Sequence, residues 1–316
     1  MLVCRKASSG PKTPIALTIG NFDGVHLGHQ AMLARLKQVA RQLHIASCVL
    51  TFEPHPREFL TPQQAPTRLT SLREKLELLA ESGIDRVQIY PFNRDFSKID
   101  ATSFITDILQ QELAVRWLLV GDDFRFGAKR TGDVEMLSKF SRQSGIFEVE
   151  VMPGFNVDGL RVSSTAIREA LVRGDLVLAE QLLGRPYSIS GRVVNGDKLG
   201  KKIGFPTANI QLKHNRPPLT GIFVVEVTSA THTALPASMR GVASLGIRPT
   251  THTNNQPILE VHLFDFCKEI YGHHLRVHFL HKLRDEEKYP DLETLIKQIE
   301  QDIANAKHYF LTTVTA

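Results

Sequence analysis

Two segments of the sequence carry residues that could hold a polyphosphate chain. The first is a glycine-rich turn, 20–29, with Gly20 at its start and His26 and His29 three residues apart near its end. Residues three apart lie on one face of a helix, so both imidazoles would point to the same side. Unpaired backbone N–H groups at a helix N-terminus stabilise phosphate oxygens without any lysine. The turn therefore predicts a phosphate site, although a tight loop whose histidines only cap a helix or pack would show the same pattern.

The second segment lies at 161–168, where three adjacent hydroxyl residues, among them Ser164 and Thr165, precede Arg168. Hydroxyl side chains at the start of a helix satisfy its first N–H groups, and an arginine one turn further in adds a positive charge. This is a second anion-binding arrangement. Two such elements in one domain predict a clamp on a polyphosphate.

A third stretch, 191–210, is also rich in glycine but lies between predicted strands, and it is not a Walker sequence. The backbone amides around Gly196 and Gly200 could cradle phosphates, and Thr207 and Asn209 provide neutral oxygen ligands of the kind that Mg²⁺ accepts beside nucleotides. A long hairpin loop with turn-forming Thr and Asn side chains explains the same residues equally well.

The elements that would position the first two segments alternate between short β-rich runs and amphipathic helical stretches from residue 15 to about residue 154. This alternation is typical of βα units around a parallel sheet, and it predicts a doubly wound α/β domain. The predicted strands are 15–20, 47–53, 86–92, 117–120 and 147–152. The predicted helices are 30–43, 71–82, 101–113 and 133–144, followed by 164–173 and 175–183.

A domain boundary is expected at Gly184-Arg-Pro186, because glycine can end a helix and proline resists its continuation. We therefore expect one domain at 1–184 and another at 185–316. After Pro186 the hydrophobic period changes to two, which predicts an antiparallel β-barrel, since closure removes exposed strand edges. Its predicted strands are 187–194, 221–229, 240–247, 258–266 and 274–283. A final helix beginning near Asp291, with apolar residues at helical spacing, should pack on that barrel.

Composition narrows the class of protein. The chain has 316 residues, a net charge of +5 and three widely spaced cysteines, which suggest neither a disulfide framework nor a thiolate zinc site. It shows no apolar run of signal-peptide or membrane-spanning length, so we expect a cytoplasmic protein. Its lysines and arginines are dispersed, which favours anionic small molecules over nucleic acid as partners. No feature indicates an oligomeric state.

The two polyphosphate segments together resemble a known signature. His26-Leu-Gly-His29 with Ser163-Ser-Thr-Ala-Ile-Arg168 is similar to the paired motifs of the nucleotidylyltransferase superfamily. The fuller strings resemble the prokaryotic bifunctional riboflavin kinase/FMN adenylyltransferase (FAD synthetase) family more specifically. They are Gly20-Asn-Phe-Asp-Gly-Val-His-Leu-Gly-His29, Phe52-Glu-Pro-His-Pro-Arg57 and Val120-Gly-Asp-Asp-Phe-Arg-Phe-Gly127.

This resemblance implies that the N-terminal half joins FMN to the α-phosphate of ATP and releases pyrophosphate. The FMN phosphate is already mostly dianionic at neutral pH, so the reaction needs alignment and charge stabilisation rather than a base. By the resemblance, His26 and His29 would donate hydrogen bonds to the phosphates. Three residues, Ser164, Thr165 and Arg168, would hold the leaving group. The nucleotide would also be contacted by Gly20, Phe22 and Asp123.

The C-terminal half resembles the riboflavin kinase family in four successive motifs. They are Gly196-x3-Gly200-x3-Gly-Phe-Pro-Thr-Ala-Asn209, Gly241-Val-Ala-Ser-Leu-Gly-Ile-Arg-Pro-Thr250, Leu259-Glu-Val-His-Leu-Phe-Asp265 and Leu283-Arg-Asp-Glu-Glu-Lys288. The family reaction moves the γ-phosphoryl group of ATP onto riboflavin, and an alcohol acceptor profits from a base. The resemblance assigns that base to Glu260. It also implies Mg²⁺, with ATP, riboflavin, FMN and FAD as substrates or products. Ser244 departs from the asparagine that the family often has.

Two other readings fit part of the sequence. A nucleotidylyltransferase of another substrate class, with a degenerate barrel, would keep His26, His29 and Arg168 but leave Pro206-Thr-Ala-Asn209 unexplained. A non-enzymatic flavin- or RNA-binding protein is supported only by the basic composition. Formation of FMN and then FAD by the purified protein would exclude both.

Overall fold

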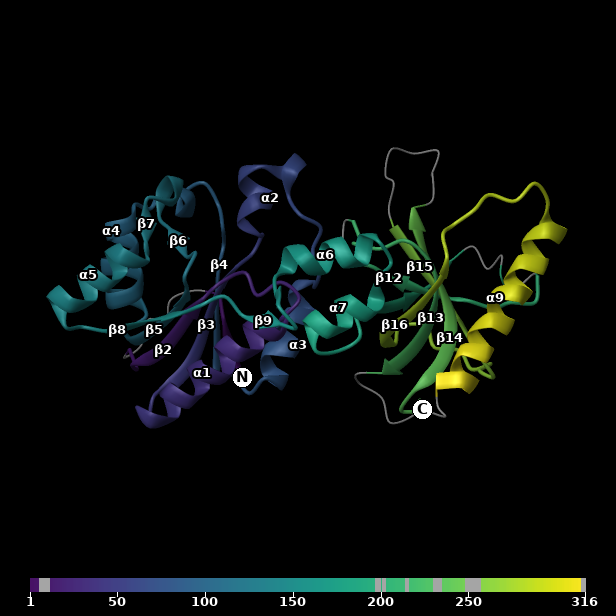
Figure 1. Cartoon of the computed structure of the whole chain (residues 1–316), viewed down its shortest axis with the longest axis horizontal. Helices are drawn as coiled ribbons and strands as arrows, with labels where there is room; N and C mark the ends of the chain where they lie inside the picture. The colour runs from purple at the N-terminus through teal and green to yellow at the C-terminus, as the bar shows by residue number, and fades with distance from the viewer. Residues whose placement is uncertain are drawn as a thin grey trace. The chain divides into compact units, whose positions relative to one another are not determined.

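The computed structural model describes residues 1–5, 12–196, 200, 203–213, 216–229, 235–247 and 257–313. It divides into two compact units (Figure 1). The first unit comprises Met1–Pro66 and Leu72–Ser163, and the second comprises Thr67–Ser71 and Ser164–Ala316. Parts of two predicted motifs, 197–199 with 201–202 and 248–250, lie outside the described residues.

A parallel sheet forms the centre of the first unit, in the strand order β1-β4-β3-β2-β5-β8. The strands are β1 (Leu2–Cys4), β2 (Ile15–Ile19), β3 (Ala46–Phe52), β4 (Arg86–Tyr90), β5 (Val115–Gly121) and β8 (Glu148–Met152). The predicted doubly wound α/β domain is confirmed, and all five predicted strands are present. The short, largely exposed β1 is a strand that the hydrophobic pattern does not indicate, because three residues are too few to show a period.

Helices cover both faces of this sheet. Alternate residues of β2 point to opposite faces of the sheet and so belong to two hydrophobic cores. Ile15 and Leu17 pack against one pair of helices, and Ala16 packs against a second pair. The first pair is α4 (Ala101–Ser103), continued by the π-helical η3 (Phe104–Glu112), with α5 (Val134–Ser144). The second is α1 (Leu27–Gln42) with α3 (Leu72–Glu81). The predicted helix 101–113 is therefore wound more widely than an α-helix, with Leu113 N–H bonded to the Ile108 carbonyl.

The second unit contains a closed barrel with the strand order β11-β12-β15-β14-β13-β16, in which every pairing is antiparallel. The strands are β11 (Ser188–Val194), β12 (Ala208–Gln211), β13 (Gly221–Ser229), β14 (Met239–Ile247), β15 (Pro257–Leu263) and β16 (His274–Arg284). The predicted barrel is thus confirmed. The additional strand β12 lies inside the glycine-rich stretch, where its alternating Ala-Asn-Ile-Gln residues are too few to indicate a strand.

The helices of the second unit within the described residues include α6 (Ser164–Val172), α7 (Leu176–Leu183) and α9 (Leu292–Thr313). As predicted, α9 begins after Asp291, whose carboxylate accepts a hydrogen bond from the Thr294 N–H at 2.8 Å. Its C-terminal half packs on the barrel through Ala306 and Phe310. Its N-terminal half differs from the prediction, because Leu292 is 52% exposed and the next apolar residues face a cavity described below.

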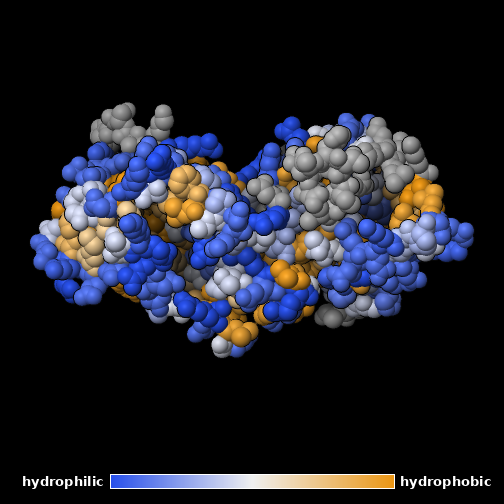
Figure 2. Space-filling view, turned by 90° about the horizontal axis from the view of Figure 1, so that it is seen from above, coloured by the Kyte–Doolittle hydropathy of each residue, from blue (hydrophilic) through white to orange (hydrophobic). Residues whose placement is uncertain are grey.

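The remaining elements are short. They are α2 (Pro56–Leu60), η1 (Pro62–Gln64), η2 (Phe96–Lys98), β6 (Arg125–Phe126), η4 (Ala128–Arg130), β7 (Gly132–Asp133), β9 (Asn156–Val157) and β10 (Leu160–Arg161). On the face seen in Figure 2, hydrophilic residues predominate and hydrophobic ones are scattered among them. Within the described residues, no helix combines the length and hydrophobicity that crossing a bilayer requires.

Candidate active sites

The glycine-rich turn 20–29 connects β2 to α1 in a strained backbone conformation. Phe22 and Val25 have φ angles of 48° and 40°, which side-chain-bearing residues rarely adopt, and Gly24 has a φ of 82°. Both side chains are buried at 1% exposure in the core beneath α1 and α3, and this packing holds the turn in place. Backbone strain of this kind persists only where the surroundings enforce it, and it clusters at functional sites.

The two histidines of the turn are in direct contact. His26 is the N-cap of α1, and its Nδ1 accepts a hydrogen bond from the His29 N–H at 3.3 Å. The imidazole rings stack with their centroids 3.6 Å apart, and the Phe22 ring lies 4.8 Å from that of His29. The structure therefore places Phe22, His26 and His29 together at a helix N-terminus, where an anion is stabilised.

Two buried polar atoms near this helix end have no hydrogen-bond partner among the described residues. Nδ1 of His29 and Oδ1 of Asn21 are buried and lack a hydrogen bond within the described part of the chain. Burial lowers the pKa of His29 well below its usual value, with further lowering by the neighbouring His26 and Lys75. Buried polar groups are nearly always satisfied, so atoms left open in this way suit a site that a ligand completes. A neutral imidazole can still donate one hydrogen bond to a phosphate.

The lowered pKa of His29 has a testable consequence. An unfolded chain binds a proton at this residue below about pH 6.5, whereas the folded protein resists it, so the unfolding free energy decreases as the pH falls through that value. We expect the His29 ring protons to keep the chemical shift of neutral imidazole from about pH 8 to about pH 6 in NMR spectra. Titration of His29 near its ordinary pKa would contradict this description.

The carboxyl ends of β2 and β5 meet at the point where the sheet reverses its strand order. The chain proceeds from β2 through β3 and β4 on one side, while β5 and β8 lie on the other. Ligands of open α/β sheets bind outside such a switch point. Gly20 directly follows β2, and Asp123 follows β5, so both lie at this edge. The exposed Asp123 carboxylate is 3.6 Å from the Arg161 guanidinium.

The second predicted anion-binding segment forms the start of α6. Ser164 and Thr165 lie in its first turn, and the Nε of Arg168 donates to the Thr67 carbonyl at 2.6 Å. These residues belong to the second compact unit, whereas His26 and His29 belong to the first. A joint clamp by His29 and Arg168 therefore stays a prediction.

A cavity of about 590 Å³, lined by barrel strands and by α9, brings together the predicted residues Thr207, Asn209 and Glu260. Thr207 directly precedes β12, and Asn209 on β12 is the register partner of Glu260 on β15. Directly opposed residues of antiparallel strands present their side chains on the same face. An amide, a hydroxyl and a carboxylate thus share one wall of the cavity, beside Gly200.

Two glycines permit close approach to these side chains. A Cβ atom at Gly196 would lie 2.4–2.7 Å from the amide group of Asn209, and one at Gly200 would lie 2.4 Å from the Phe205 carbonyl oxygen and 3.3 Å from Thr207 Oγ1. Distances below 3.0 Å force atoms to shift. The predicted glycines therefore have a steric role in holding Thr207 and Asn209 where they are.

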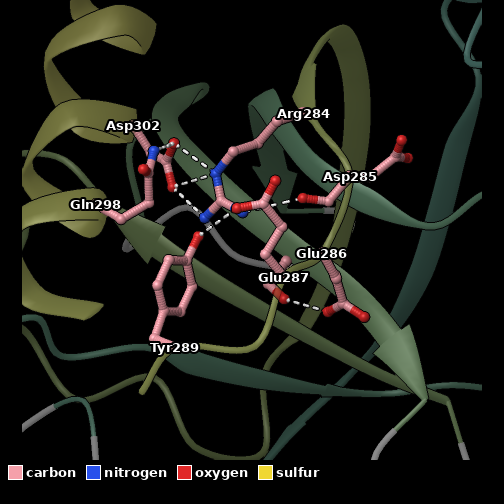
Figure 3. A network of polar contacts seen from close by, with 8 residues as sticks. Arg284, Asp285, Glu286, Glu287, Tyr289, Gln298 and Asp302 are labelled. Carbon is pink, nitrogen blue, oxygen red and sulfur yellow. Dashed lines mark hydrogen bonds and ion pairs between the residues drawn. The ribbon is translucent and has the colours of Figure 1, made fainter. Parts of the chain in front are cut away.

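The cavity is also lined by polar residues to which the sequence assigns no role. The Arg284 guanidinium binds Asp302 of α9 through three hydrogen bonds of 2.7–3.2 Å, and Gln298 donates to the same carboxylate at 3.1 Å (Figure 3). The Tyr289 ring lies 5.7 Å from the guanidinium carbon. One signal for Asp302 is present in the sequence, since it is an acidic residue on the apolar stripe of the last helix.

Ser244 lies on β14 opposite Glu260 and lines the same cavity. Its hydroxyl donates to the Glu286 carboxylate at 3.0 Å. Gly246 makes room for this contact, because a Cβ atom there would lie 1.8–2.2 Å from the Glu286 carboxyl group. The Ser244 side chain is therefore bonded to the segment after β16.

Comparison with known proteins agrees with this division of sites. A family model described as FAD synthetase matches residues 9–166, and one described as riboflavin kinase matches residues 183–310. The bifunctional riboflavin kinase/FMN adenylyltransferase of Escherichia coli (strain K12) is 45% identical over 98% of this chain and 97% of its own length. The protein of the same name from Haemophilus influenzae is 48% identical over 93% and 94%.

A solved structure has the same fold. The crystal structure of a protein named as a macrolide-efflux protein from Streptococcus pneumoniae matches with a TM-score of 0.78 and 26% identity, covering 96% of this chain and 97% of that one. The two bifunctional enzymes match nearly the whole chain, and the two family models match it in the expected order. These matches decide the family of the chain. The chain belongs to the family of bifunctional riboflavin kinase/FMN adenylyltransferases, with its FAD synthetase part first and its riboflavin kinase part second.

Proposed function

We propose that riboflavin is phosphorylated in the barrel cavity with Glu260 as the general base. The observation that carries this proposal is the register pairing of Glu260 with Asn209 in one cavity that Thr207 also lines. The terminal ribityl hydroxyl would attack the γ-phosphorus of ATP while its proton passes to the Glu260 carboxylate. The bond between the γ-phosphorus and the β,γ-bridging oxygen breaks, and ADP leaves.

Thr207 and Asn209 fit a magnesium site beside the phosphates. Both offer neutral oxygen atoms, and a glycine backbone approaches each side chain closely, Gly196 at Asn209 and Gly200 at Thr207. A Mg²⁺ ion held there would neutralise charge that develops on the transferred phosphoryl group. The chain's own contribution is to orient these two oxygens and to keep Glu260 on the neighbouring strand.

The rest of the cavity suits the flavin. Its apolar lining includes Ile222 of β13, Val242 of β14, Ile258 of β15, and Leu295, Ile299 and Ile303 of α9. Such a surface stabilises a large flat ring system by removing it from water. The polar residues nearer to Glu260 would then face the ribityl chain. We infer that riboflavin binds with its ring against α9 and its terminal hydroxyl toward Glu260.

Adenylyl transfer is assigned to the turn before α1 and the start of α6. The FMN phosphate would attack the α-phosphorus of ATP, and pyrophosphate would leave without a general base, because the attacking group is already ionised. His26 and His29 would hold the phosphates, and Ser164, Thr165 and Arg168 the departing pyrophosphate. Gly20, Phe22 and Asp123 would border the nucleotide. The open Nδ1 of His29 at a helix N-terminus supports this assignment.

We place the boundary between the two functional domains after residue 184, giving 1–184 and 185–316. The family matches at 9–166 and 183–310 support this position. Residues 164–184 pack with the second unit in the structure, so a fragment for separate study should retain them with the barrel.

Adding one methyl group at Gly196 tests whether Asn209 takes part in the proposed binding of Mg²⁺ and phosphate. Gly196→Ala should push the Asn209 amide aside, and misplacement of about 1 Å can reduce a rate by about 100-fold. We expect FMN formation to fall at least tenfold, and the half-saturating Mg²⁺ concentration to rise. Steady-state assays over a Mg²⁺ series measure both, with adenylylation of supplied FMN as the internal control. An unchanged Mg²⁺ requirement would exclude Asn209 as a ligand.

A further inference from the structure

The ion pair between Arg284 and Asp302 joins the end of β16 to the middle of α9. Arg284 Nη2 lies 2.7 Å from Asp302 Oδ2, and Nε lies 3.0 Å and 3.2 Å from the two carboxylate oxygens. The two side chains are only 19% and 5% exposed. Arg284 Nη1 also donates to the Asp285 carbonyl, so the guanidinium is held from two sides (Figure 3). A planar guanidinium group that is bound in this way has a fixed orientation.

This ion pair lies where the packing of α9 changes. The buried residues of α9 within the described chain are Asp302, Ala306 and Phe310. Ala306 and Phe310 belong to a hydrophobic cluster with Val224 of the barrel. The half that precedes Asp302 instead turns apolar residues, Leu295 and Ile299 among them, toward the cavity. Asp302 is therefore the first anchor of α9 on the side where the helix forms a cavity wall.

We propose that Asp302 is a positioning residue for riboflavin phosphorylation. By binding Arg284 it sets the position of the N-terminal half of α9, and with it the distance between the apolar wall of Leu295 and Ile299 and the facing strands. The inference rests on the assignment of the kinase reaction to this cavity. Asp302 itself would act through Arg284 and α9 rather than by contact with the reacting atoms.

The position of Asp302 beside the apolar wall predicts that its loss affects the binding of riboflavin and not that of ATP. The apolar wall that Asp302 controls would contact the flat flavin ring, whereas Gly200, Thr207 and Asn209 would contact the nucleotide phosphates from β12 and the loop before it. Loss of the ion pair should therefore weaken riboflavin binding and leave ATP binding largely unchanged. A general loss of stability would affect both substrates together.

The same helix provides a matched control. Gln298 donates to Asp302 Oδ1 at 3.1 Å, and Gln301 donates to Asn305 Oδ1 at 2.9 Å. Both are glutamine side chains bonded four residues ahead, but only Gln298 supports the ion pair. Gln298→Ala and Gln301→Ala thus remove the same kind of hydrogen bond and differ in whether Asp302 is involved.

The test measures riboflavin and ATP binding in the full chain with Asp302→Asn, Gln298→Ala and Gln301→Ala. In Asp302→Asn the amide directs N–H groups at the guanidinium, so we expect the riboflavin dissociation constant, measured by flavin fluorescence, to rise about tenfold. Gln298→Ala should raise it about threefold and Gln301→Ala should leave it unchanged. The KM for ATP should stay within about twofold in all three.

The opposing results are equally definite. Equal losses for riboflavin and ATP, or the same riboflavin affinity in Gln298→Ala as in Gln301→Ala, would overturn the positioning role. Circular dichroism checks the fold, and if Asp302→Asn does not fold, the Gln298 and Gln301 pair decides. Failure of the assigned kinase site is a different result, namely persistent FMN formation by Glu260→Gln.

Discussion

Glu260→Gln should reduce FMN formation by about 100-fold or more while the protein continues to adenylylate supplied FMN. General bases contribute about 10²–10⁴-fold, and a glutamine amide of nearly the same shape cannot accept the hydroxyl proton. The substitution keeps the pairing of β12 with β15, because that pairing uses backbone groups. Chromatographic assays with riboflavin and with FMN as separate substrates measure the two rates.

The matched control for this variant is Glu293→Gln. Glu293 lies in the first turn of α9, its side chain is 80% exposed, and it pairs with Lys297 on the helix surface. The same loss of one negative charge should change neither rate there. Wild-type FMN formation by Glu260→Gln would remove Glu260 from the reaction and would require another base in the cavity.

His29→Ala should have the converse effect, lowering adenylylation of FMN by about 10²–10³-fold, as loss of one preorganised donor does at charged transition states. FMN formation from riboflavin should remain, because the described residues that line the proposed kinase cavity all belong to the second unit. The variant also loses the ring stacked on His26. Folding should therefore be checked by thermal unfolding alongside the two assays.

His44→Asn is a control within the same unit. His44 is exposed just beyond α1 and has a φ of 53°, a conformation that asparagine tolerates. Both activities should be unchanged in this variant. If His29→Ala kept full adenylyl transfer, the turn before α1 would be only a structural loop. Its glycines would then form a tight turn, and its histidines would only cap the helix or pack.

The sequence predicts the architecture well because its periodicities are strong. Five β-rich runs alternating with amphipathic helical stretches indicate a parallel sheet, and the change to period two after Pro186 indicates a different fold. The boundaries are harder to predict where elements are short. Strand β12 has four residues, and its Asn209 is recognisable by motif rather than by hydrophobic pattern. A resemblance to a family finds Asn209 and Glu260, but only the register shows that they face each other.

The part of the cavity beside α9 could not be predicted in the same way. Arg284 and Asp302 are 18 residues apart, and their pairing depends on how α9 packs against the barrel. The helical spacing of Leu295, Ile299 and Ile303 predicts side chains that are packed in the hydrophobic core. In the structure these side chains line a cavity instead, since the helix is anchored further along at Ala306 and Phe310. Tertiary packing, which spacing does not specify, decides between these outcomes.

Mixing Glu260→Gln with His29→Ala, each of which should lack one of the two reactions, tests most directly whether one chain carries two separate sites. Glu260→Gln and His29→Ala should each fail to convert riboflavin to FAD when supplied with Mg·ATP. Combined in one tube, they should form FAD, because His29→Ala releases FMN and Glu260→Gln adenylylates it. If the mixture forms no FAD, or if either folded variant has lost both half-reactions, the assignment of Glu260 and His29 to independent sites is wrong.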